Sequence, residues 1–91
     1  MLEKADMTIA EWMHGQGKGP AEILRYFAAT HPQIGTPDLM DLMQRAFSLS
    51  FDSVLCIGGW WHDGTSELSD EQLDSLLIPA IQQAYRMKRT R

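Results

Sequence analysis

Apolar residues recur along this chain at the spacing of short amphipathic helices. In the segment 36–47 five of them share one stripe: Leu39, Leu42, Met43, Ala46 and Phe47. On the opposite face Asp41 and Arg45 are four residues apart, which is the spacing of an ion pair on a helix surface. Thr36 is the expected cap, and Pro37 follows in the first turn. The segment is therefore predicted to be a helix with one buried face.

A first helix is predicted near the start of the chain. Thr8 and Glu11 have the spacing of a capping box, in which each side chain binds an exposed backbone amide. The helix should run to about His14 and end at the glycine-rich run 15–19. Residues 1–7 are expected to be a frayed terminus.

The second predicted helix begins at Pro20, because a proline at the first helical position lacks only an amide hydrogen that would have no partner there. It should end before Pro32. Three apolar residues share its inner face, with a fourth on the flank: Ile23, Tyr26 and Phe27, then Leu24.

The pattern of the segment 50–59 allows two assignments. Ser50 and Ser53 resemble a capped helix start, and Phe51, Val54 and Leu55 follow at helical spacing. A helix through residues 54–57 is favoured, although a short buried strand is the alternative for such an apolar run. The pair 58–59, both glycine, is the expected stop.

The last helix is predicted to begin after Ser69, which has Gln72 as its capping-box partner. Six apolar residues then keep one phase: Leu73, Leu76, Leu77, Ala80, Ile81 and Ala84. Pro79 lies inside this pattern and crowds the carbonyl of Ser75, so one kinked helix is expected rather than two helices.

These segments predict an all-α fold, a compact single domain over residues 1–91 built as a bundle of four to five short helices. The apolar share of 44% and the charged share of 22% are ordinary for a globular domain. No apolar run exceeds five residues, far short of the roughly 20 that cross a bilayer, so no membrane association is expected. The N-terminus has no signal-peptide pattern, and the single Cys56 favours a reducing, cytoplasmic setting.

Charge is distributed unevenly along the chain. The net charge is −4, yet residues 46–85 contain no lysine or arginine. That stretch holds these carboxylates: Asp52, Asp63, Glu67, Asp70, Glu71 and Asp74. An acidic chain is a poor general partner for nucleic acid, because phosphate contacts supply most nonspecific affinity. The basic tail 86–91 is interpreted as a solvated end that favours a helix C-terminus.

No pattern in the sequence predicts catalysis, a metal site or a cofactor. His14, His31 and His62 lack the spacing of zinc ligands, and none of them is near Cys56. The glycine-rich run 15–19 fits neither the P-loop nor the dinucleotide fingerprint. The chain is therefore expected not to be an enzyme.

The most informative cluster is aromatic and acidic: Trp60, Trp61, His62 and Asp63, followed by Gly64. At 100° per residue, one flank of the last helix combines acids with apolar residues: Glu71, Asp74, Ile78 and Tyr85. Acids steer a basic partner, and a buried indole holds it. We therefore expect a protein-binding surface in which Trp60 or Trp61 is exposed and fills a pocket.

The chain resembles the small acidic immunity proteins encoded beside bacterial toxins, such as those of contact-dependent growth inhibition systems. The resemblance is strongest in the second half, in residues 47–51, 57–64 and 69–73. The resemblance implies a cytoplasmic protein that binds one cognate toxin domain, often a nuclease with a basic surface, and neutralises it.

The expected toxin-binding residues come from the acidic and aromatic positions described above: Trp60, Trp61, His62, Asp63, Glu67, Asp70, Glu71, Asp74, Ile78 and Tyr85. Two alternatives use other features of the chain. One is a phage or plasmid inhibitor that mimics DNA with the same acids. The other is a small helix-turn-helix regulator that binds DNA with residues 8–31 and the basic tail.

Overall fold

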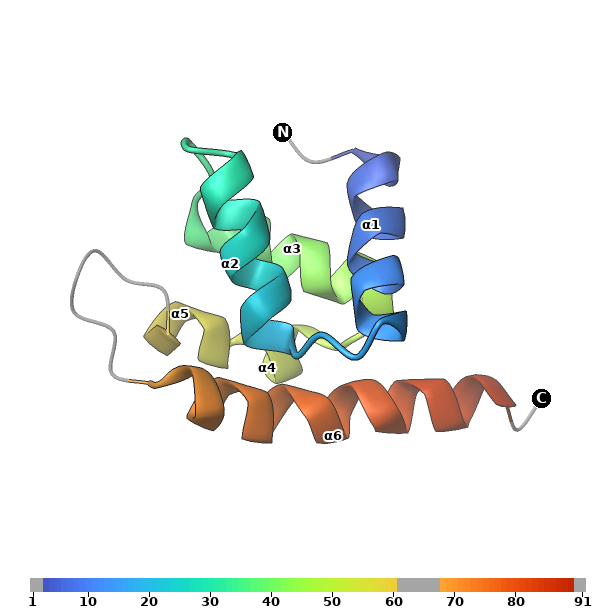
Figure 1. The fold of residues 1–91 in the computed structure, drawn as a ribbon. Coiled ribbons are helices and arrows are strands. Elements are labelled where there is room, and N and C mark those ends of the chain that lie inside the picture. The colour runs from blue at the N-terminus through green and yellow to red at the C-terminus, as the bar shows by residue number, and fades with distance from the viewer. Residues whose placement is uncertain (1–2, 61–67, 90–91) are drawn as a thin grey trace.

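The computed structural model describes residues 3–60 and 68–89, and the side chains of this range up to residue 87. Six helical segments follow one another (Figure 1): α1 (Lys4–Gly15), α2 (Pro20–Thr30), α3 (Thr36–Phe47), α4 (Phe51–Val54), α5 (Cys56–Trp60) and α6 (Asp70–Arg89). Within the described residues no strand is present. The prediction of an all-α bundle is confirmed.

Helix α6 forms one long side of the molecule, and the other helices lie against it (Figure 1). At about 1.5 Å per residue its 20 residues span roughly 30 Å, most of the longest dimension of 42 Å. Helices α1 and α2 extend away from α6, and α3 lies behind them. Helices α4 and α5 pack between α3 and α6.

The core is a single cluster of apolar side chains to which every helix contributes. Helix α3 supplies all five residues of its predicted stripe: Leu39, Leu42, Met43, Ala46 and Phe47. Helix α6 adds Leu73, Leu77 and Ile81, which are fully buried. Burying one such aliphatic side chain stabilises the fold by about 1.5–3 kcal/mol, so this cluster sets the arrangement of the helices.

The first helix begins earlier than its sequence predicts. It starts at Lys4, because the Asp6 carboxylate accepts a hydrogen bond of 2.8 Å from the amide of Glu3. Thr8 lies inside the helix, where its hydroxyl donates to the carbonyl of Lys4. The capping box at Thr8 and Glu11 is therefore wrong, and so is the frayed terminus for residues 4–7; residues 1–2 lie outside the described residues.

Helices α2 and α3 follow their predicted bounds closely, with two corrections. The cap of α3 is Gly35, whose amide donates to the Asp38 carboxylate, and Thr36 is the first helical residue. In α2 the flanking Leu24 is fully buried, whereas Tyr26 is 42% exposed. The inner face of α2 is thus rotated towards Leu24, because α2 packs on α6 as well as on α1.

The segment 51–60 is helical on both sides of Leu55, so the helix favoured over a strand is confirmed. Ser50 caps α4, since its hydroxyl accepts from the amide of Ser53. The glycine pair 58–59 does not end the helix, however. Helix α5 continues through it to Trp60, because Ile57 and Trp60 are both buried and hold this turn against the core.

The capping box of α6 is confirmed. The Ser69 amide donates to the Gln72 side chain at 2.9 Å, and the Gln72 amide donates to the Ser69 hydroxyl at 3.1 Å. The helix is continuous through Pro79, as expected. Leu76 is 51% exposed and does not belong to the buried stripe, because it lies about 100° around the helix from Leu77.

Candidate binding surface

Trp60 is not an exposed anchor. Its side chain is 3% exposed at the end of α5, and its indole nitrogen donates a 2.8 Å hydrogen bond to Oδ1 of Asp70. A buried indole needs such a partner for its N–H group. The expectation that the Trp60 indole could be the exposed one is therefore wrong.

Asp70 is also bound within the molecule. The guanidinium of Arg25 donates from Nε to Oδ2 at 2.8 Å and from a terminal nitrogen to Oδ1 at 2.7 Å. The same guanidinium lies 5.3 Å from the ring centroid of Trp60. The hydrogen bond from Arg25 has the largest effect on the pKa of Asp70, and the hydrogen bond from Trp60 has the next largest. The pKa is lowered from 3.8 to about 2. The three residues join α2, α5 and α6.

Asp74 has a structural role one turn further along α6. Its Oδ1 accepts a 2.9 Å hydrogen bond from the amide of Ala21, in the first turn of α2. The first amides of a helix have no partner within the helix, so this carboxylate caps α2 from another helix. Gly19 makes the approach possible, because a Cβ there would lie 2.9 Å from Asp74 Oδ2.

Tyr85 lies in an aromatic stack at the other end of α6. Its ring is parallel to that of His14, with centroids 5.5 Å apart, and His14 meets Phe47 edge-on at 5.3 Å. Burial, and then the nearby charge of Glu11, raise the pKa of Tyr85. The ring is still 39% exposed, and Ile78 on the same flank is 38% exposed. This flank is therefore partly covered by α1 and α2.

The remaining predicted residues divide into two groups. Glu71 lies exposed in the first turn of α6. Four others lie outside the described residues: Trp61, His62, Asp63 and Glu67. Two of the predicted acids, Asp70 and Asp74, bind groups of α2 within the molecule.

The exposed indole in the described part of the chain is Trp12, at 64%, a position that the sequence interpretation did not select. Because α1 begins at Lys4, the helical spacing of its residues predicts that Trp12 is exposed. Ala10 and Met13 face the core, and Trp12 lies on the other side of the helix. Four more large apolar side chains on α4, after it and on α6 are about half exposed or more: Phe51, Leu55, Leu76 and Met87.

Ion pairs within the chain use equal numbers of acids and bases, so they leave the net charge of −4 unchanged. Lys18, Arg25 and Arg45 are each paired with a carboxylate of the same chain. Two exposed bases in the described residues, Lys4 and Arg86, have no ion pair. Five exposed acids have none either: Glu3, Glu11, Asp38, Asp52 and Glu71. The described surface therefore presents unneutralised carboxylates, which suits a cationic partner.

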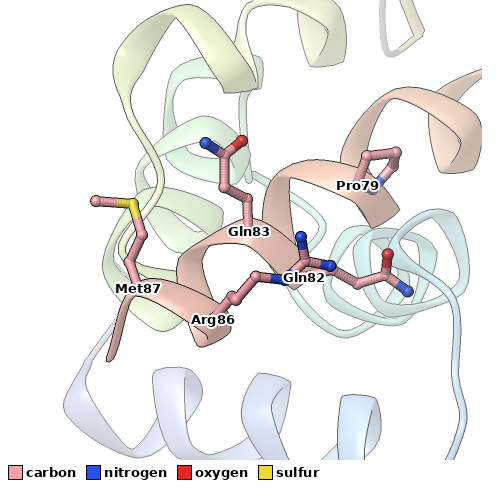
Figure 2. Close-up of a pocket in the computed structure, with 5 residues that line it drawn as sticks. All are labelled: Pro79, Gln82, Gln83, Arg86 and Met87. Carbon is pink, nitrogen blue, oxygen red and sulfur yellow. The ribbon is translucent and has the colours of Figure 1, made fainter. Parts of the chain in front are cut away.

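The outer face of α6 has a shallow hollow near its C-terminal end. Figure 2 shows the five residues that line it: Pro79, Gln82, Gln83, Arg86 and Met87. All five come from one helix, so no second element closes the hollow around a ligand. Among the described residues no group of three histidine, cysteine or acidic side chains is placed to hold a metal ion, and no described helix is long and apolar enough to cross a membrane.

The arrangement of α2 bears on the DNA-binding alternative. Arg25, the arginine that α2 could offer to phosphates, is held by Asp70. Comparison of the chain with models of protein families, with curated proteins and with solved structures gave no match.

Proposed function

We propose that this protein is an immunity protein, which binds a cognate toxin domain in the cytoplasm and neutralises it without catalysing a reaction. The observation that supports this proposal best is the charge balance of the described surface. Three bases are paired internally, and the five exposed acids without an ion pair in the described part of the chain outnumber the two exposed bases without one, Lys4 and Arg86.

The proposed mechanism is competition for a basic surface. A nuclease toxin binds phosphates through lysines and arginines, and carboxylates of an inhibitor can occupy the same groups. Opposite charges accelerate the encounter, and apolar side chains at the centre of the contact slow dissociation. The exposed apolar residues on α1, α4 and α6 can supply that central contact.

The experiment is a titration with the toxin domain encoded beside this protein, followed by isothermal calorimetry and by a nuclease assay. We expect one-to-one binding, loss of nuclease activity at equal concentrations, and weaker binding as salt rises. A charge reversal, Glu71→Lys, should slow association. The matched control is Glu22→Lys on α2, which changes the net charge by the same amount at a carboxylate that is paired with Lys18.

Two results would contradict the proposal. Absence of binding to the neighbouring gene product would exclude the immunity role. Inhibition of an unrelated nucleic-acid enzyme in the same assay would instead favour the DNA-mimic inhibitor.

A further inference from the structure

The outer face of α6 is uncharged along its middle. Leu76 is 51% exposed there, and Pro79, Gln82 and Gln83 are exposed as well. The range 75–85 contains no charged residue, which is about three helical turns. The centres of protein–protein contacts are depleted in charge, whereas a solvated helix face normally carries it. This stretch of α6 is therefore suited to contact with another protein.

The shallow hollow near the C-terminal end of α6 lies on the same face (Figure 2). Gln83 and Met87 contribute to its lining. At 100° per residue, Leu76 is within about 20° of each of them around the helix, so the exposed leucine and the hollow share one stripe. One helix forms the whole lining. The hollow can therefore accept a side chain from an adjacent helix more readily than it can enclose a small molecule.

One acid and one base flank the uncharged stretch. Glu71 and Arg86 are both exposed, and neither has an ion pair within the described residues. They lie about 60° apart around the helix, and Arg86 is opposite the fully buried Leu77, so both face outward. Glu71 precedes Pro79 by eight residues and Arg86 follows it by seven. Each charge is thus roughly 10–12 Å from Pro79 along the helix axis.

From this arrangement we propose that α6 docks against α6 of a second copy of this chain, with the two helices antiparallel and Pro79 near the two-fold axis. Glu71 of each copy then lies level with Arg86 of the other, and two ion pairs form. Leu76 of each copy lies level with the hollow of the other. A parallel pair would instead place glutamate beside glutamate and arginine beside arginine.

The proposed contact is small, because it involves one helix from each copy. A helix about 30 Å long and roughly 10 Å wide offers a footprint of about 300 Å², less than the ~800 Å² that each partner buries in a standard interface. We therefore expect a weak dimer, with a Kd on the order of 10–100 µM. At about 1 µM the chain should be monomeric, so this dimer neither requires nor tests the immunity function.

The test is sedimentation equilibrium of the full chain from about 5 to about 500 µM, a range that spans the expected Kd. Leu76→Glu should weaken self-association by at least about tenfold, because it places a carboxylate in each half of the contact. The matched control is Trp12→Glu on α1, which adds the same charge at an apolar side chain that is 64% exposed. It should dimerise like the wild type. Both variants should keep the helical circular dichroism, since both positions are exposed.

Exchanging the two charges tests the antiparallel orientation. Glu71→Arg and Arg86→Glu should each weaken the dimer by about 3- to 10-fold, because each single variant sets like charges against one another. The double variant should recover the wild-type affinity. Glu71→Arg brings the net charge of −4 closer to zero, so general repulsion between copies cannot explain its loss of affinity.

Three results would overturn the proposal. The first is a wild-type chain that is still monomeric at about 500 µM. The second is a dimer that survives Leu76→Glu or that Trp12→Glu abolishes, because the contact would then lie away from the outer face of α6. The third is a double variant, Glu71→Arg with Arg86→Glu, that dimerises no better than the single variants, since the antiparallel pairing requires recovery.

Discussion

The indole nitrogen of Trp60 lies 2.8 Å from Oδ1 of Asp70, so the last residue of α5 is hydrogen-bonded to the first residue of α6. Arg25 binds both oxygens of the same carboxylate from α2. Three helices therefore meet at one aspartate. Two residues expected to bind a toxin instead bind one another, and their contribution should be seen in stability.

The carboxylate of Asp70 should make stability sensitive to acid. Its pKa falls from 3.8 to about 2 in the folded protein, so its contribution is present above about pH 4 and is lost as the pH falls towards 2. The side chain is 44% exposed, so screening limits the contribution to about 1 kcal/mol. Asp70→Asn should lower the free energy of unfolding by that amount at pH 7, as measured by urea denaturation.

The same variant should flatten the pH dependence. Between pH 4 and pH 2 the loss of stability should be smaller in Asp70→Asn than in the wild type. The control is Glu71→Gln, an exposed neighbour without an ion pair in the described residues. Parallel acid curves for the wild type and Asp70→Asn would show that the contacts of Asp70 carry no net energy.

Asp74 and Gly19 should be energetically coupled. Asp74→Ala removes the carboxylate that caps α2 through the amide of Ala21, which should cost about 1 kcal/mol. Gly19→Ala places a methyl group 2.9 Å from Asp74 Oδ2 and displaces the same carboxylate. The double variant should therefore be less destabilised than the sum of the two single variants, by about 0.5–1 kcal/mol in a double-mutant cycle. Additive effects would indicate that the carboxylate moves aside and keeps its bond to Ala21.

Local signals in the sequence predicted most of the helices. The stripe of α3, the proline that begins α2 and the capping box of α6 all depend on residues a few positions apart, and the structure confirms each of them. The glycine pair 58–59 failed as a stop, because burial of Ile57 and Trp60 outweighs the low helix propensity of glycine.

The candidate site was harder to predict, because its chemistry depends on distant residues. The local sequence around an aspartate in the first turn of a helix does not distinguish a side chain that faces solvent from one that faces another helix. Asp70 is 45 residues from Arg25, and Asp74 is 53 residues from Ala21. Burial of Trp60 depends on the same long-range packing. The exposure of Trp12, in contrast, follows from the phase of α1 once the helix is known to begin at Lys4.

Two adjacent leucines should differ sharply in their contribution to stability. Leu77 is fully buried beneath α6, whereas Leu76 is 51% exposed. Leu77→Ala should lower the free energy of unfolding by about 2–5 kcal/mol through lost burial and a residual cavity. Leu76→Ala should change it by less than about 0.5 kcal/mol. Similar losses in thermal unfolding would mean that Leu76 also packs in the core.

The unexpected continuation of α5 through its glycines should permit stabilisation. Gly58 lies inside the helix, its φ is not positive, and an added Cβ would have Thr36 Cγ2 as its nearest neighbour, at 3.9 Å. Gly58→Ala should therefore raise the free energy of unfolding by about 0.5–1 kcal/mol, because alanine loses less backbone entropy on folding. Gly17→Ala provides the opposite control, since Gly17 has a φ of +88° that a side chain disfavours. A destabilised Gly58→Ala in denaturant unfolding would contradict the helical assignment of this turn.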